Sequence, residues 1–318
     1  DIGGTWHENH YPGCACDVQS ALYSFSFEQN PDWSRMYAQQ KEIKAYLKRC
    51  AEKYGLTRHI KLNTHVAGAR FDEKTQSWTV ETCDSPKLWA YMQSKDLNPG
   101  DKLDRKDKEL PKFSSFKADI VVSGMGGLST PAYPNIKGIE SFTGKSFHSQ
   151  DWDHDYDFKG KRVAVIGTGA SAIQIVPELQ KVAGHLDVYQ RTAPWVLPRH
   201  DRTYTLPERT ALKHVPFLRD AYRTAIYWGR ETYVPAFAWK PELALPAQRA
   251  ALGNIRKAIK DPALREKVTP DFQIGCKRIL ISNAYYPALA ADNTEVVTDR
   301  IERITPTGIV TADGTERE

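Results

Sequence analysis

Residues 161–191 hold the feature that most restricts how this chain can fold: an apolar run, a glycine-rich turn, a helical stretch and a second apolar run. Gly167, Gly169 and Ala172 follow the spacing G-x-G-x-x-A. The first glycine permits a tight turn, the second lets the backbone approach a pyrophosphate, and the alanine lets the helix pack on the strand. The spacing alone is weak, but a strand before it and a helix after it favour a dinucleotide site over a merely structural turn.

The helix that follows this turn directs its N-terminus at the bound anion. We therefore expect the turn and the start of the helix to bind the cofactor through Gly167, Thr168, Gly169, Ala170, Ser171, Ala172 and Gln174.

The end of the second apolar run predicts which dinucleotide is bound. NAD sites usually carry Asp or Glu there, whereas this chain has Gln190, Arg191 and Thr192. A guanidinium matches a 2′-phosphate, and a carboxylate would repel it. The sequence therefore predicts NADPH rather than NADH, with a surface arginine as the alternative interpretation of Arg191.

The remaining pattern is typical of an α/β protein in which strands alternate with helices. We expect a helix over 33–56 capped by Asp32, and helices within 205–265. Strands are expected over 59–72, 77–83, 118–127, 161–167, 186–191, 275–282 and 294–299, with a solvated surface insertion over 85–116. The 318 residues can form two domains, with a boundary between 130 and 160.

Composition excludes several other classes. The net charge is only +5 and the basic residues are scattered, which argues against a nucleic-acid partner. No run approaches the 18 apolar residues of a membrane helix. Five cysteines without a CxxC pair predict no metal site and a reduced, cytoplasmic setting.

Phe142, Gly144, His148, Trp152 and Asp153 spell F-x-G-x-x-x-H-x-x-x-W-D just upstream of the turn. Taken alone, this is a linker with a structural histidine. The string resembles the fingerprint of type I Baeyer–Villiger monooxygenases, which use FAD and NADPH, and it stands where that family has it. Related flavin monooxygenases usually end a similar string without Trp-Asp. A linker between nucleotide domains that shift makes His148 a hinge contact rather than a general base.

Other segments carry the same resemblance: GGTW at 3–6, YPGCACD at 11–17, YSFSF at 23–27 and GCKR at 275–278. The resemblance implies that FAD is contacted by Thr5, Trp6, Asp17, Tyr23 and Val66. It also implies that Lys277 joins Arg191 and Thr192 at the 2′-phosphate. Arg278 is then the active-site arginine, within the cofactor site, and Asp17 holds it by a charge-assisted pair. A surface or second phosphate-binding arginine and a loop-capping aspartate are the alternatives.

The family resemblance implies two dinucleotide-binding, Rossmann-like domains, of which the first is incomplete at its N-terminus. The expected divisions are a partial FAD domain over 1–135, the fingerprint linker over 136–160, an NADP domain over 161–290 with a helical insertion at 205–265, and a return toward the FAD domain over 291–318.

The reaction that the resemblance implies consumes O₂, NADPH and a ketone. It inserts one oxygen atom beside the carbonyl through a flavin C4a-peroxide and gives an ester or lactone. Two alternatives stay open: a flavin monooxygenase that oxidises nitrogen or sulfur, and a non-catalytic NADP-binding fragment.

Overall fold

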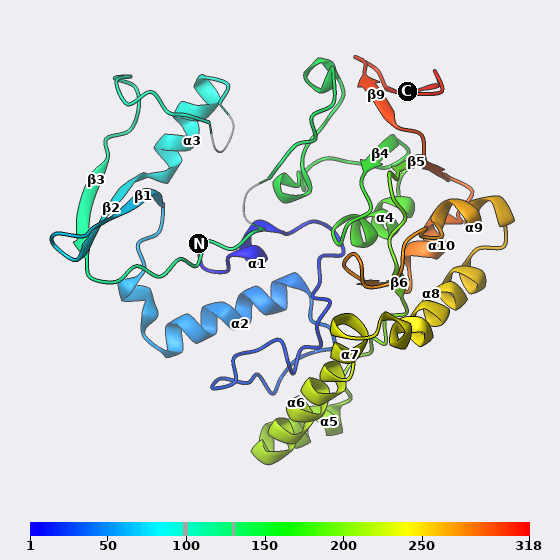
Figure 1. The fold of residues 1–318 in the computed structure, drawn as a ribbon, viewed down its shortest axis with the longest axis horizontal. Helices are drawn as coiled ribbons and strands as arrows, with labels where there is room; N and C mark the ends of the chain where they lie inside the picture. The colour runs from blue at the N-terminus through cyan, green and yellow to red at the C-terminus, as the bar shows by residue number, and fades with distance from the viewer. Residues whose placement is uncertain (98–100, 129–130) are drawn as a thin grey trace. The chain divides into compact units, whose positions relative to one another are not determined.

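The computed structural model describes residues 1–97, 101–128 and 131–318, so that 98–100 of the predicted surface insertion lie outside the description. The chain forms two compact units. The first comprises Asp1–Glu8 and Leu47–Thr130, and the second Asn9–Tyr46 and Pro131–Glu318. Figure 1 labels the elements of both units.

The first unit contains an antiparallel sheet in the order β1-β2-β3. Its elements are α1 (Thr5–Glu8), η1 (Leu56–His59), β1 (Thr64–Asp72), β2 (Ser77–Asp84), α3 (Ser85–Ser94) and β3 (Ser114–Ala118). The strands predicted over 59–72 and 77–83 are present as β1 and β2, which pair antiparallel, and Gln76 with φ 49° lies in the turn between them. Strand β1 carries a bulge between Val66 and Gly68.

The predicted solvated insertion is only partly correct, because it contains a helix with its own core. Asp84 caps α3 by accepting a hydrogen bond from the Lys87 N–H at 2.9 Å. The helix packs its apolar face into a cluster made of Cys83, Leu88, Tyr91, Met92 and Leu110. The segment is rich in charged residues, yet the apolar residues on one face of α3 join a buried cluster.

The buried strand predicted over 118–127 is wrong. Strand β3 ends at Ala118, and beyond it Ile120 is 80% and Val122 is 88% exposed. An apolar run is buried as a strand only where neighbours hydrogen-bond to it and cover its faces. Among the described residues, no strand pairs with 119–127.

Helix α2 spans Gln40–Lys53, so the predicted start near Asp32 is wrong. Residues 36–40 are instead held extended against 14–20: the Ser20 N–H donates to the Met36 carbonyl at 2.7 Å, and the Gln40 N–H donates to the Cys14 carbonyl at 3.0 Å. These long-range backbone bonds occupy groups that a helix would have used internally, which delays the start of α2.

The second unit is built on a parallel sheet in the order β4-β5-β8. Its strands are β4 (Arg162–Ile166), β5 (His185–Tyr189) and β8 (Thr294–Val297), and α4 (Ala172–Gln180) connects the first two (Figure 1). Val176 of α4 and Leu186 and Val188 of β5 are fully buried. The predicted strand–turn–helix–strand and the α/β class are confirmed.

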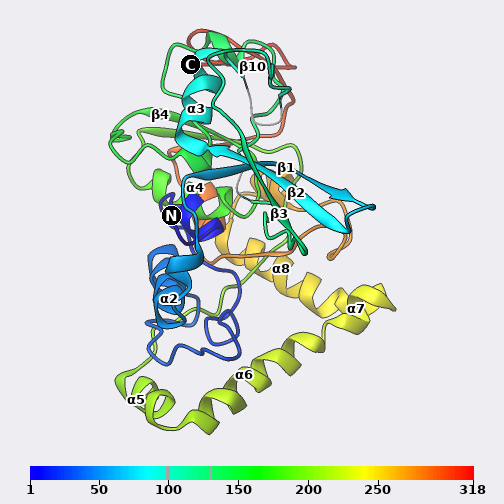
Figure 2. The ribbon, with the colours of Figure 1, turned by 90° about the vertical axis from the view of Figure 1, so that its left-hand side faces the viewer.

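The other elements of this unit lie outside that sheet. Strands β6 (Val196–Leu197) and β7 (Leu280–Ile281) pair in parallel, so only two residues of the strand predicted over 275–282 form one. The helices predicted within 205–265 are present as α5 (Leu206–His214), α6 (Pro216–Glu231), α7 (Val234–Ala238), η4 (Pro241–Ala244), α8 (Leu245–Ala258) and α9 (Pro262–Val268), most of which Figure 2 shows.

Short elements complete the unit: η2 (Ile139–Ser141), η3 (Ser149–Asp151), α10 (Tyr285–Leu289), and the strands β9 (Ile301–Ile304), β10 (Ile309–Thr311) and β11 (Glu316–Arg317). In the part of the chain that the structure describes, no helix is long and apolar enough to cross a membrane.

Candidate functional site

The glycine-rich turn between β4 and α4 has the shape that an anion site requires. Gly167 adopts φ +114°, which L side chains rarely adopt, and the space beside Gly167 and Gly169 is open. No acceptor in the described ranges receives the backbone N–H groups of residues 168–172. The turn therefore presents unpaired donors and open space at the N-terminus of a nine-residue helix, and the pyrophosphate of a dinucleotide fits this donor set.

Thr168 ties this turn to the end of β5, because its hydroxyl donates to the Thr192 carbonyl at 3.0 Å. Gln190 is buried and its amide donates to the Lys267 carbonyl at 2.7 Å, so it faces the protein. Arg191 is exposed, and its side chain has no partner in the described part of the chain. It is thus available to a ligand phosphate.

Lys277 lies on the loop before β7, with its ammonium 4.6 Å from the centre of the Phe272 ring. This loop is fixed to the segment that follows Arg191. The Trp195 indole donates to the Phe272 carbonyl at 2.8 Å, and the Leu280 N–H donates to the Trp195 carbonyl at 2.9 Å. The two predicted 2′-phosphate segments therefore belong to one packed substructure.

The loop of residues 11–17 docks on α4 through Gln174. The Gln174 amide donates to the Ala15 carbonyl at 2.9 Å, and its oxygen accepts from the Ala15 N–H at 3.3 Å and the Tyr11 hydroxyl at 3.2 Å. Gly13 has φ +79°, and a Cβ there would lie 2.6 Å from the Gln174 carbonyl oxygen. The Gln174 side chain, predicted to bind the cofactor, contacts protein here.

This docking buries two thiols beside the site. Burial raises the pKa of Cys14 and of Cys16 to about 11 each. Both cysteines are free. Thiols with such pKa values are protonated at neutral pH, so they act as small packing residues rather than nucleophiles.

Asp17, at the end of this loop, contacts Arg278. The Arg278 Nη2 donates to the Asp17 Oδ2 at 2.5 Å, across 261 positions of sequence. The Arg278 side chain is 62% exposed and that of Asp17 is 29% exposed. Such an exposed pair contributes at most about 1 kcal/mol to stability, so its consequence is the orientation of the guanidinium. The predicted pairing of these two residues is present.

The predicted flavin contacts are distributed over both units. Thr5 and Trp6 lie in α1 and Val66 lies at the bulge of β1, all in the first unit. Tyr23 lies in the second unit, on a loop held by Arg223 of α6. The Arg223 Nη1 donates to the carbonyls of Ala21, Leu22 and Ser24 at 3.0, 2.9 and 3.0 Å.

The fingerprint residues pack within the second unit. Phe142 joins a cluster with Tyr189 and Val297, and Gly144 is required because a Cβ would lie 2.7 Å from the Phe142 ring. The His148 ring accepts from the Gln150 N–H at 3.2 Å and caps η3. These contacts hold the linker in place, and the hinge role of His148 stays a prediction.

Trp152 and Asp153 complete the fingerprint. Trp152 is buried between Phe147 and Phe158, with ring centroids 5.3 and 5.4 Å away. Lys145 bonds to Asp153 at 2.6 Å and holds the pKa of that carboxyl below its usual range. The string therefore packs on the parallel sheet at Phe142 and on aromatic residues of the linker at Trp152.

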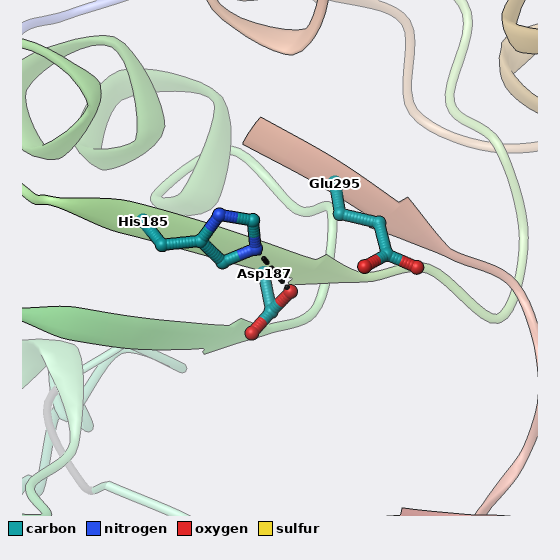
Figure 3. Close-up of side chains that lie close together, drawn as sticks. All are labelled: His185, Asp187 and Glu295. Carbon is teal, nitrogen blue, oxygen red and sulfur yellow. Dashed lines mark hydrogen bonds and ion pairs between the residues drawn. The ribbon is translucent and has the colours of Figure 1, made fainter. Parts of the chain in front are cut away.

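The parallel sheet carries a group of three side chains of types that can bind metal ions: His185, Asp187 and Glu295 (Figure 3). One nitrogen or oxygen atom of each side chain lies within 4.8 Å of those of the other two. His185 and Asp187 are 3.0 Å apart. Arg317 bonds to Glu295 at 2.6 Å and lowers the pKa of that carboxyl, and Arg162 lies 3.7 Å from Asp187. Since arginines partner both carboxylates, we interpret the group as an ion-pair network of the sheet.

Sequence reasoning missed Arg199 and Arg223, whose side chains donate to backbone carbonyls of the loops within residues 16–37. Neither lies in a motif, and no periodicity marks them. Carbonyl acceptors carry no side-chain signature, so only the fold could identify these contacts.

Residues 101–227 match the family described as FMO-like, flavin-binding monooxygenase-like. A Baeyer–Villiger monooxygenase of Pseudomonas aeruginosa is 50% identical over 317 residues, which are 100% of this chain and 55% of that protein.

Structures of two enzymes share the fold. An oxidized steroid monooxygenase bound to NADP is 32% identical with a TM-score of 0.79, over 100% of this chain and 63% of that one. A complex of OTEMO with FAD and NADP is 28% identical with a TM-score of 0.76, over 99% of this chain and 63% of that one.

By sequence, residues 101–227 match the flavin-binding monooxygenase-like family, and the whole chain shares its fold with the steroid monooxygenase structure. The chain is similar along its whole length to Baeyer–Villiger monooxygenases, which confirms the resemblance seen in the fingerprint. The chain spans about half the length of the curated relatives it matches.

Proposed function

We propose that this chain provides the NADPH-binding part and the active-site arginine of an FAD- and NADPH-dependent Baeyer–Villiger monooxygenase. The overall reaction converts a ketone, O₂, NADPH and a proton into an ester or lactone, NADP⁺ and water. The observation that carries the proposal is the Asp17–Arg278 pair, which brings together two segments far apart in sequence and orients a guanidinium.

NADPH binding is assigned to the turn, to the exposed Arg191 after β5 and to the exposed Lys277 before β7. The free N–H groups of residues 168–172 would receive the pyrophosphate. Arg191 and Lys277, with Thr192, would receive the 2′-phosphate, because a guanidinium and an ammonium complement its charge. The NADP-bound steroid monooxygenase and OTEMO structures support this assignment.

FAD binding is assigned to Thr5, Trp6, Asp17, Tyr23 and Val66. The exposed Tyr23 and Val66 side chains suit contact with a large planar ring system. We propose the finer division of the fold on the same basis: two dinucleotide-binding domains, an incomplete first one over 1–135, the linker 136–160, the second domain 161–290 with the insertion 205–265, and the return 291–318.

FAD, when bound, would supply the redox chemistry with NADPH and O₂. Arg278 supplies a fixed positive charge, since arginine stays protonated and presents several donors in a rigid fork. It would stabilise the negative charge that develops on oxygen as the ketone is attacked. Asp17 holds the fork in one orientation, so that the electrostatic stabilisation is present before the reaction starts.

The test is a mass-identified product assay on the full-length protein with NADPH and a panel of cyclic ketones. Wild type should give the lactone. Arg278→Ala should still consume NADPH but lose product formation by about 100-fold or more. The matched control is Arg303→Ala, which removes an exposed arginine of β9 and should change nothing.

Failure of wild type to make lactone from any ketone would refute the proposal. A thioether in the same panel separates the runner-up reaction, because oxidation of the thioether alone would indicate a sulfur-oxygenating enzyme.

A further inference from the structure

We propose that Arg199 is a positioning residue for the Asp17–Arg278 pair: its side chain fixes the backbone that carries Asp17, and its main chain fixes the segment that carries Arg278. Its consequence for catalysis rests on the proposed function, whereas its consequence for geometry does not.

The side-chain contacts bind the loop on the Asp17 side. The Arg199 Nη2 donates to the carbonyl of Cys16, the residue before Asp17, at 3.2 Å, and also lies 3.4 Å from the Tyr37 carbonyl. The guanidinium carbon is 4.9 Å from the centre of the Tyr37 ring. One guanidinium thus joins two backbone segments that run side by side.

The main-chain contacts bind the segment on the Arg278 side. The Arg199 N–H donates to the Asn283 side-chain oxygen at 2.8 Å, and the Asn283 amide donates to the Arg199 carbonyl at 2.6 Å. Asn283 follows β7 closely, and Arg278 precedes β7. This reciprocal pair adds to the parallel pairing of β6 with β7.

The charge of Arg199 is retained at a cost. Its side chain is only 16% exposed, and burial lowers the pKa of the guanidinium. The nearest carboxylate is Asp201 at 3.7 Å, and Arg35 takes the same carboxylate at 2.8 Å. Burying a cation that shares its counter-ion costs free energy, which hydrogen bonds to the guanidinium offset in part. Here those bonds lead to the two segments of the candidate site.

The first experiment needs no activity. Backbone hydrogen exchange of residues 16–20 should accelerate on the order of tenfold or more in Arg199→Met, because the Cys16 carbonyl loses a charged donor. Arg199→Lys, which keeps the charge but not the fork, should give a smaller increase. The matched control is Arg202→Met, which removes an arginine three positions away that bonds to Glu208 at 2.6 and 2.8 Å. Unchanged exchange in Arg199→Met would overturn the proposal.

The second experiment is a double-mutant cycle on the full-length protein, measuring lactone formed per NADPH consumed. Arg199→Met should lower this ratio on the order of tenfold, with the KM for NADPH unchanged. Combined with Arg278→Ala, it should cause no further loss, because Arg199 acts through Arg278. Asn283→Ala should lower the ratio in the same direction and guards against a variant that fails to fold.

Additive losses in the cycle would also overturn the positioning role. If wild type forms no lactone while exchange still accelerates in Arg199→Met, the proposed function fails, but the role of Arg199 in fixing the two backbone segments is retained.

Discussion

The glycine-rich turn of residues 167–172 and the Asp17–Arg278 pair are both suited to negative charge, but they are built in opposite ways. The turn is local: five consecutive residues, 168–172, supply backbone donors, and one strand and one helix fix them. The pair is assembled from side chains 261 positions apart, and it depends on Gln174, Arg199 and Asn283 to bring the segments together.

The contrast shows where each region is vulnerable. A local backbone site survives most substitutions elsewhere, because its geometry follows from the strand and helix beside it. A site assembled over a long distance is lost when any docking contact fails, although its own residues are intact. The two regions can therefore be separated experimentally.

The largest effect is expected from Gly13→Ala. The new Cβ would lie 2.6 Å from the Gln174 carbonyl oxygen at a residue with φ +79°, so loop and helix must separate. We expect a loss of about 2–3 kcal/mol of unfolding free energy from backbone strain and overpacking. Urea denaturation measures the loss, and calorimetry should show that NADPH binding persists. If NADPH binding fails as completely as docking, the turn is not independent of the loop.

Gln174→Ala should give an intermediate effect. It removes three hydrogen bonds to the loop without introducing a clash, for a loss of about 1–2 kcal/mol. The N–H groups at the turn are untouched, so the affinity for NADPH should hold. A large loss of affinity would instead support a direct contact between Gln174 and the cofactor.

Labelling of Cys14 and Cys16 reports whether the loop of residues 11–17 is docked on α4. Burial raises the pKa of Cys14 and of Cys16 to about 11. The reactive thiolate is therefore a small fraction of each cysteine at pH 7.5, and this fraction increases as the pH rises toward 11. At pH 7.5 a maleimide should label the exposed Cys276 first. In Gly13→Ala, Cys14 and Cys16 should become labelled as well, as mass spectrometry of tryptic peptides would show. Rapid labelling of Cys14 in wild type would show that the loop is not docked.

The smallest effect on stability is expected from Asp17→Asn. The pair with Arg278 is exposed, so the change in unfolding free energy should stay below about 1 kcal/mol. The product ratio should nevertheless fall, because the guanidinium loses its orienting partner. A stability loss of several kcal/mol, with the product ratio intact, would make Asp17 a structural loop cap.

The sequence predicted the local region well and the assembled region only through a family resemblance. The spacing of Gly167, Gly169 and Ala172 between an apolar run and a helical stretch encodes its own structure. Nothing in the residues around Asp17 or Arg278 points to the other, because long-range contacts leave no periodic pattern. The resemblance to the fingerprint family supplied their pairing, and the structure supplied Arg199, whose acceptors are backbone carbonyls.

The same distinction accounts for the errors. The helix expected from Asp32 begins at Gln40 because residues 36–40 hydrogen-bond to a distant loop, and the run 118–127 is exposed because no described strand pairs with it. In each case the local sequence favoured the predicted type of element. The structure differed because residues 36–40 have a long-range partner and the run 118–127 has none among the described strands.

The most direct test of cofactor binding at the turn is isothermal calorimetry of NADPH and NADH on wild type and Arg191→Ala. Wild type should bind NADPH at least about tenfold more tightly than NADH, since one charge-assisted bond to the 2′-phosphate suffices for that difference. Arg191→Ala should lose this preference while its affinity for NADH holds. Equal affinities for the two dinucleotides in wild type, or an equal loss of both in Arg191→Ala, would contradict the assignment.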